Sequence, residues 1–285
     1  MELKVTTYGV DADGVATVQF NRPGRGNSWT ARMNEEFRFL MAQADADPQV
    51  RVIVLTGGGR QFCVGADFGA LDFYAEGDKD YLATVRGERF AQPGYGVRPE
   101  FDHDLVWQWG LRKPVLAAIN GACAGIAVAI AGFCDLRYAV AGAKFTTVAP
   151  RIGLPAEYGM AWLLPRLMGV THAMDVLLTG RVFLAEEARA MGFLNAVFAQ
   201  DEFAARIAEI ARNIARNGSP RAMERTKRQV YGELMAADVG ACVEDSKRLI
   251  GEFMQSPDFR EGVAAQREQR LPRFAALAGG REAGQ

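Results

Sequence analysis

Apolar and polar positions follow two different periods over the first part of the chain. The segment 15–20 reads Val-Ala-Thr-Val-Gln-Phe and predicts a strand, which the Asn-Arg-Pro-Gly turn at 21–24 ends. The run 50–56 is almost wholly apolar and predicts a buried strand. Between them, helical spacing predicts a helix that Thr30 caps and Asp47-Pro48 ends, with one apolar face formed by Met33, Phe37, Leu40, Met41 and Ala44. A strand, a helix and a second strand favour parallel pairing with a right-handed crossover.

An uncharged stretch lies in the middle of the chain, from Pro114 to Cys134. Its start predicts a strand over 114–119, Asn120-Gly121 breaks that strand, and 125–133 predicts a helix with few side-chain atoms in its first turn. A bare helix start presents unpaired N–H groups, which can receive an oxygen that gains negative charge. A membrane span is disfavoured by the break and by the Ala and Gly content, whereas a tightly packed helix without chemistry remains a second interpretation.

The segments around this stretch carry weaker signals. Residues 62–67 follow a strand and are small and apolar, like the start of the central helix. Residues 73–98 are polar without a clear period, which suits either a flap over a site or a surface excursion. A helix is expected over 102–112, and short strands are expected over 135–140 and 144–146.

The second half of the chain is predicted to be almost wholly helical. Pro155 suits a helix start, which would place Glu157 in the first turn, where an acid often is only a solvated charge. The division expected from these patterns is a core over 1–200 and a helical region over 201–285. The helical segments are expected at 173–178, 184–191, 201–217, 219–235 and 238–254.

Composition excludes several classes of protein. The 33 Lys and Arg balance 34 Asp and Glu, so no net field favours nucleic acid or an anionic membrane. Two histidines exclude a histidine-rich site, so no metal is expected, and no serine stands in a Gly-x-Ser-x-Gly elbow. The four cysteines lack metal spacing and suit buried, reduced thiols. The start of the chain shows no secretory signal, so a cytoplasmic location is expected.

Several motifs stand in an order that resembles the crotonase superfamily, also called the enoyl-CoA hydratase/isomerase family. The resemblance runs from Val15 to about Phe274. The motifs are Asn21-Arg22-Pro23 with Asn27 and Thr30, the segments 52–57 and 62–67, Lys113 to Gly121, Cys134-Asp135, Gly153-Leu154-Pro155, Leu164-Pro165-Arg166, 178–181 and 185–188 with Gly192.

This resemblance implies an α/β fold, a crotonase-type spiral of repeated β-β-α units with a C-terminal helical trimerisation region. It also implies an acyl-CoA thioester as substrate, no cofactor beyond the coenzyme A that the substrate carries, and a homotrimer or dimer of trimers. Carried over by position, the two backbone N–H groups that hold the thioester oxygen belong to Ala66 and Ile126. Two donors on an enolate oxygen stabilise it by roughly 3 kcal/mol each.

The sequence departs from the two-glutamate hydratases that it resembles. Their glutamates align with Ala129 and Ala149, which cannot transfer a proton. Glu157 aligns with the single acid of several double-bond isomerases, and an apolar surrounding would raise its pKa. Isomerisation of 3-enoyl-CoA to 2-enoyl-CoA therefore fits best. Hydration of enoyl-CoA, acyl-CoA binding without catalysis, and thioester hydrolysis or carbon–carbon cleavage remain alternatives.

Residues that contact coenzyme A are harder to place. Arg25 on the first loop is expected to meet the phosphates, and Cys63 and Gly65 belong to the turn before Ala66. Near the C-terminus, the segment with Arg270, Arg273 and Phe274 resembles the one that brings a basic side chain and an aromatic ring to the adenine, sometimes from a neighbouring subunit. A solvated helix end explains these arginines equally well. His103 is expected to be a surface or core histidine rather than a base, and Cys63 and Cys123 show no paired base that would make them nucleophiles.

Overall fold

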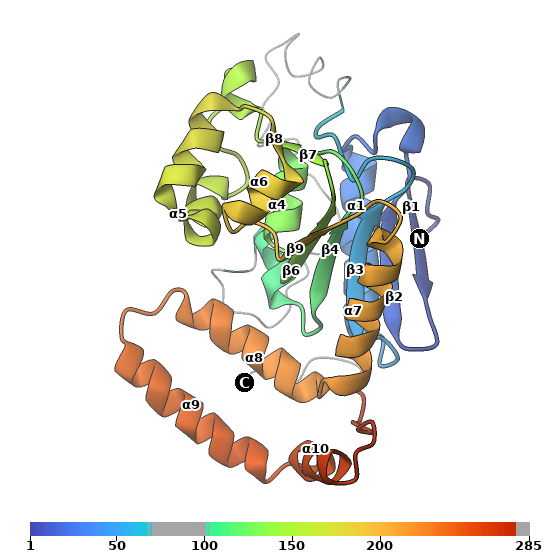
Figure 1. Cartoon of the computed structure of the whole chain (residues 1–285), viewed down its shortest axis with the longest axis vertical. Helices are drawn as coiled ribbons and strands as arrows, with labels where there is room; N and C mark the ends of the chain where they lie inside the picture. Colours follow the sequence, from blue (N-terminus) through green and yellow to red (C-terminus); the bar gives the residue numbers. More distant parts are fainter. Residues whose placement is uncertain (68, 70–100, 102, 278–285) are drawn as a thin grey trace.

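A mostly parallel sheet forms the centre of the computed structural model, which describes residues 1–67, 69, 101 and 103–277 (Figure 1). Six strands form this sheet in the order β1-β2-β3-β4-β6-β9. The edge strand β1 is antiparallel to β2, and the other neighbours pair in parallel. The strands are Thr6–Val10 (β1), Val15–Phe20 (β2), Val52–Gly57 (β3), Val115–Ile119 (β4), Leu136–Val140 (β6) and Ala196–Phe198 (β9).

A second, smaller sheet forms where successive turns of the chain pair with one another. It contains β5 (Cys123–Ala124), β7 (Lys144–Thr146) and β8 (Phe183–Leu184), in that order. Two isolated bridges, between Cys63 and Cys123 and between Trp29 and Ala66, continue the same row towards the start of the chain. After a strand of the large sheet, the chain therefore pairs with the previous turn before a helix follows, as the predicted β-β-α repetition requires.

Helices α1 (Ala31–Ala46) and α7 (Phe203–Asn217) pack against the large sheet. The predicted apolar face of α1 is confirmed, since its five residues are buried, and Thr30 accepts a hydrogen bond from the Met33 N–H at 3.2 Å as the cap. In α7, the buried residues are Phe203, Ile207, Ala211 and Ala215, and they belong to the same core as the sheet. The core therefore continues through α7, beyond residue 200.

The other helices of the core are α4 (Ile126–Gly132), α5 (Met160–Thr179) and α6 (Ala185–Ala190), with the short 3-10 turns η1 (Pro23–Arg25), η3 (Val106–Gly110) and η4 (Ala149–Ile152). Of these, α4 and α6 contact strands of the second sheet. The backbone of α5 breaks at Gly169. No helix of the described residues is long and apolar enough to cross a membrane. The uncharged stretch instead forms β4, β5 and the seven-residue helix α4.

Three further helices extend away from the sheet: α8 (Pro220–Glu233), α9 (Val239–Met254) and α10 (Pro257–Arg267) (Figure 1). We call α8 to α10 the helical extension. It exposes many large apolar side chains, namely Val230, Leu234, Met235, Val239, Val243, Ile250, Met254, Phe259 and Val263. Such a surface is typical of a protein–protein interface.

The structure corrects three predictions of secondary structure. Within the described part of 102–112, a 3-10 turn, η3, forms where a longer helix was expected. Residues 153–159 form a loop rather than a helix start, because Gly153, Tyr158 and Gly159 have positive φ values of 76°, 46° and 75°. The second half also contains β8 and β9, which are too short to leave a periodic pattern. The segment 73–98 lies outside the described residues.

Candidate active site

Two backbone segments, 62–67 and 122–126, lie side by side beyond the carboxyl ends of β3 and β4. The Cys63 N–H donates to the Ala122 carbonyl and the Ala124 N–H donates to the Cys63 carbonyl, both at 3.0 Å. Beyond this pair the chains stay close, since a Cβ on Gly65 would lie 3.2 Å from the Ala124 oxygen. Gly65 and Gly125 have φ values of +98° and +53°, which other residues rarely adopt. The sequence thus places glycine where each segment turns.

The next residue on each segment carries an N–H without an acceptor among the described residues. These N–H groups belong to Ala66 and Ile126. Their neighbours are bonded: the Gly65 carbonyl accepts from Trp29 at 2.7 Å and the Gly125 N–H donates to Thr146 at 2.9 Å. The bridge to Trp29 therefore leaves the Ala66 N–H on the opposite side of the strand. Two such donors on adjacent segments can hold one negatively charged oxygen.

Asp67 fixes the turn that follows Ala66. Its carboxylate accepts hydrogen bonds from the Ser28 hydroxyl at 2.8 Å and from Arg22 at 3.0 Å, and these contacts, led by that of Ser28, lower its pKa. The side chain of Asn27 donates to the carbonyls of Gly58 and Gln61 at 3.0 and 2.7 Å. Sequence reasoning assigned no role to Ser28 or Arg22, although the Asn-Arg-Pro motif signalled this loop.

The chain that leads into α5, from Val148 to Gly159, contacts the residues that flank α4 on either side. At the start, Val148 faces Gly125, since a Cβ on this glycine would lie 3.7 Å from a Val148 methyl. At the far end, a Cβ on Gly159 would lie 3.5 Å from the ring of Phe133, the residue that follows α4. Glu157 lies two residues before Gly159, so it belongs to the part of the loop that meets the C-terminal end of α4, the helix that begins at Ile126.

Glu157 is half-buried, and its carboxylate makes no hydrogen bond or ion pair with the described residues. Burial alone raises its pKa above the ordinary value of 4.5. The neighbouring side chains of Tyr158 and Trp162 pack against the hydrophobic core, so one side of the loop is apolar. A carboxylate without partners and with a raised pKa is suited to accept and return a proton.

The two alanines that the sequence resemblance aligns with the glutamates of hydratases both lie in this region. Ala129 lies on α4 and Ala149 on η4, and both are fully buried. Neither position supplies an acid. The described residues also contain no group of three side chains that could hold a metal ion.

The residues predicted to contact coenzyme A fall into two groups, and the first lies beside Ala66. Arg25 is exposed on η1, and the next residue, Gly26, contacts Val64, since a Cβ there would lie 2.9 Å from a Val64 methyl. Cys63 is fully buried, and burial raises the pKa of its thiol to about 12. Its N–H and carbonyl are both bonded, so Cys63 holds the turn in place and is not a reactive thiol.

The second group consists of Arg270, Arg273 and Phe274. It lies at the end of the large sheet where the parallel strands begin, whereas the two donors lie beyond the end where they finish. The carbonyl of Phe274 accepts from Arg51, just before β3, at 2.9 Å, whereas Ala66 follows the end of β3. A strand of this length spans about 20 Å. Arg270 is engaged by Glu261 and Glu268, each at 2.6 Å. One protomer therefore does not bring these residues to the Ala66 and Ile126 donors.

A cavity of about 410 Å³ lies beside this second group. Its wall combines the turn before β2, the end of α7 and the C-terminal segment, through residues that include Asp13, Arg51, Arg216 and Arg273. Asp13 is held by Arg212 and Arg216 at 3.2 and 2.8 Å. The cavity thus lies at the end of the sheet where the parallel strands begin, away from the two donors.

Comparisons with known proteins agree on one family. A sequence model of the enoyl-CoA hydratase/isomerase family matches residues 11–276. The probable enoyl-CoA hydratase of Rhodobacter capsulatus is 34% identical, and the 1,2-epoxyphenylacetyl-CoA isomerase of Escherichia coli is 32% identical, each over 92% of this chain and 95% of the relative. The crystal structure of the enoyl-CoA hydratase from Bacillus anthracis superposes with a TM-score of 0.83, at 25% identity, over 96% of this chain and all of that one.

Proposed function

The chain belongs to the enoyl-CoA hydratase/isomerase family of the crotonase superfamily, and on that premise we propose that it isomerises 3-enoyl-CoA to 2-enoyl-CoA with a single glutamate. The family makes it an enzyme that processes acyl-CoA. Two observations carry the finer proposal: the N–H groups of Ala66 and Ile126 have no acceptor among the described residues, and the half-buried carboxylate of Glu157 has no partner there.

The reaction needs two functions, and each is assigned to one part of the site. The Ala66 and Ile126 N–H groups hold the thioester oxygen, and each donor stabilises the enolate by roughly 3 kcal/mol. Glu157 takes a proton from carbon 2 of the 3-enoyl group, which leaves a dienolate. It then returns the proton to carbon 4, which moves the double bond into conjugation. No water enters or leaves, so the reaction does not need the acids that Ala129 and Ala149 lack.

Contacts with coenzyme A are proposed for both groups of residues. Arg25 meets the phosphates beside the turn of Cys63 and Gly65. The coenzyme A of a neighbouring subunit is contacted by Arg270, Arg273 and Phe274. Within one chain these residues lie at the end of the sheet where the parallel strands begin, away from the two donors. The exposed apolar side chains of the helical extension support assembly as a homotrimer or dimer of trimers. Analytical ultracentrifugation would test that assembly, and a monomer would contradict both statements.

Substrate tests with a matched pair of variants separate the alternatives. We expect the wild type to form conjugated 2-enoyl-CoA from 3-enoyl-CoA, and Glu157→Gln to lower kcat by about a hundredfold or more with little change in KM. The control is Glu202→Gln, which changes an exposed glutamate next to α7 and should keep full activity. Undiminished isomerisation by Glu157→Gln would refute the role of Glu157.

Hydration is the second candidate, because several relatives are named as hydratases. It predicts that 2-enoyl-CoA is consumed in favour of 3-hydroxyacyl-CoA, at a rate above that of isomerisation. Release of free thiol from the thioester would indicate a hydrolase instead. Binding of acyl-CoA esters by the wild type without turnover of either substrate would indicate a binding protein.

A further inference from the structure

The helix that starts at Ile126 is held at its other end by polar contacts. The side-chain amide of Gln108 donates to the Ile130 carbonyl at 3.2 Å, and Arg137 donates to the carbonyls of Gly132 and Cys134 at 3.3 and 2.6 Å. A helix of seven residues is only about 10 Å long. A shift at its last turn therefore moves its first N–H by a similar amount.

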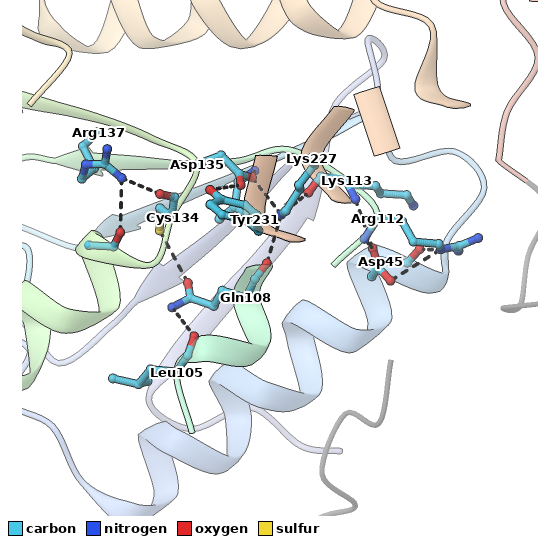
Figure 2. A network of polar contacts seen from close by, with 12 residues as sticks. Asp45, Leu105, Gln108, Arg112, Lys113, Cys134, Asp135, Arg137, Lys227 and Tyr231 are labelled. Atoms are coloured by element: carbon cyan, nitrogen blue, oxygen red, sulfur yellow. Dashed lines mark hydrogen bonds and ion pairs between the residues drawn. The ribbon is translucent and has the colours of Figure 1, made fainter. Parts of the chain in front are cut away.

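Asp135 lies three residues after Gly132, the last residue of α4, and connects this end of the helix to the helical extension (Figure 2). One carboxylate oxygen accepts from the Val115 N–H at 2.6 Å and from Lys227 at 2.8 Å, and the other accepts from the Tyr231 hydroxyl at 2.7 Å. Lys227 and Tyr231 both lie on α8. They come from a region remote in sequence and carry no part of the proposed proton transfer.

The same contact also reaches η3 and the start of β4. Lys227 is buried and donates further to the carbonyls of Gln108 and Lys113, at 3.0 and 3.1 Å (Figure 2). The ring of Tyr231 stacks on Trp109 at 4.2 Å between centroids, and Trp109 contacts Phe133 at 5.1 Å. Since a buried lysine needs partners for all its N–H groups, these contacts fix the position in which this end of α8 packs on the core.

We propose that Asp135 is a positioning residue through which Lys227 and Tyr231 of α8 set the place of α4, and so of the Ile126 N–H that holds the substrate oxygen. The proposal rests on the proposed function, since it needs Ile126 as a donor. In this proposal, the position of the Ile126 N–H depends on how the helical extension packs against the core. The exposed apolar side chains of that extension suit contact with a partner subunit.

Tyr231→Phe is the sharpest test, because it removes one hydrogen bond and keeps the ring stack on Trp109. Its control is Tyr138→Phe on β6, where a tyrosine ring likewise stacks on an aromatic ring, that of Phe198 at 6.0 Å. The readout besides kcat is the infrared carbonyl band of bound butyryl-CoA labelled with ¹³C at the thioester carbon. Hydrogen bonds in the site lower the frequency of this band.

We expect Tyr231→Phe to lose part of that lowering and to reduce kcat about fivefold at nearly constant KM, whereas Tyr138→Phe changes neither. Asp135→Asn should lose more, and adding Tyr231→Phe to it should cost nothing further, because the two residues act through one contact. A variant that loses only stability, with the carbonyl band and kcat of the wild type, would overturn the proposal. If the wild type itself shows no lowering of the band, the proposed function fails first.

Discussion

Replacing Gly65 by alanine should disable the site while leaving the fold in place. The backbone there has a φ of +98°, which costs alanine about 1–2 kcal/mol. The new Cβ would also lie 3.2 Å from the Ala124 oxygen, closer than carbon and oxygen normally pack. The 62–67 and 122–126 segments must then separate by a few tenths of an ångström. Because Ala66 and Ile126 follow directly, the two N–H groups no longer converge on one oxygen.

The expected loss is that of one donor, about a hundredfold in kcat, with a loss of unfolding free energy of about 1–3 kcal/mol. Gly142→Ala is the matched control. It adds a Cβ at a φ of +73° with no atom within 4 Å, on the turn after β6. Steady-state rates and urea unfolding of both variants separate strain from catalysis. If Gly65→Ala turns over substrate like the wild type, the N–H groups of these segments do not hold the oxygen.

Three further predictions follow from burial. If the carboxylate of Glu157 is the base, kcat/KM falls with decreasing pH around a midpoint above the ordinary 4.5, and a midpoint at or below that value would speak against it. Because burial raises the pKa of Glu157, its charged form destabilises the folded state. Glu157→Gln should therefore have a larger free energy of unfolding than the wild type at neutral pH, as measured by urea unfolding. This difference should shrink as the pH falls through the raised pKa towards 4.5. A wild type as stable as the variant would contradict it. Burial raises the pKa of the Cys63, Cys123 and Cys134 thiols, so a colorimetric disulfide reagent should react quickly with Cys242 alone, and a Cys242→Ser chain that still reacts quickly would refute this burial.

The long elements could be predicted because their patterns are long. Helix α1 has a capping Thr30 and an apolar face of several turns, and β3 has a continuous apolar run, so both were found within a few residues. The crotonase-type fold itself is confirmed by solved relatives with similar backbones. Its motifs are spread over the whole chain, and their order carries more information than any one of them.

Of the second sheet, β7 was predicted over 144–146, whereas its other members could not be predicted because they exist through pairing rather than through composition. β5 and β8 have two residues each, and the bridges at Ala66 and Cys63 have one. Glu157 was placed in a helix because Pro155 resembles a helix start. The positive φ values at Tyr158 and Gly159 put it in a loop instead, a difference that leaves the proposed role intact.

The contact between α8 and Asp135 was also hidden in the sequence. A helix rich in Arg and Lys suggests solvated charges, and Arg221 is indeed exposed on α8, whereas Arg225 and Arg228 are half-buried. Lys227 differs only because Asp135 and two carbonyls, all remote in sequence, lie around it. No spacing within α8 marks this lysine as buried.

The most direct test of the account is exchange of the proton next to the thioester carbonyl. Butyryl-CoA in D₂O has acidic hydrogens on carbon 2 but no double bond to move, so mass spectrometry reports proton removal alone. We predict that the wild type incorporates deuterium at carbon 2, and that Glu157→Gln binds butyryl-CoA as tightly yet exchanges at least a hundredfold more slowly. Equal exchange by the two proteins would contradict the claim that Glu157 moves the proton at an oxyanion site formed by Ala66 and Ile126.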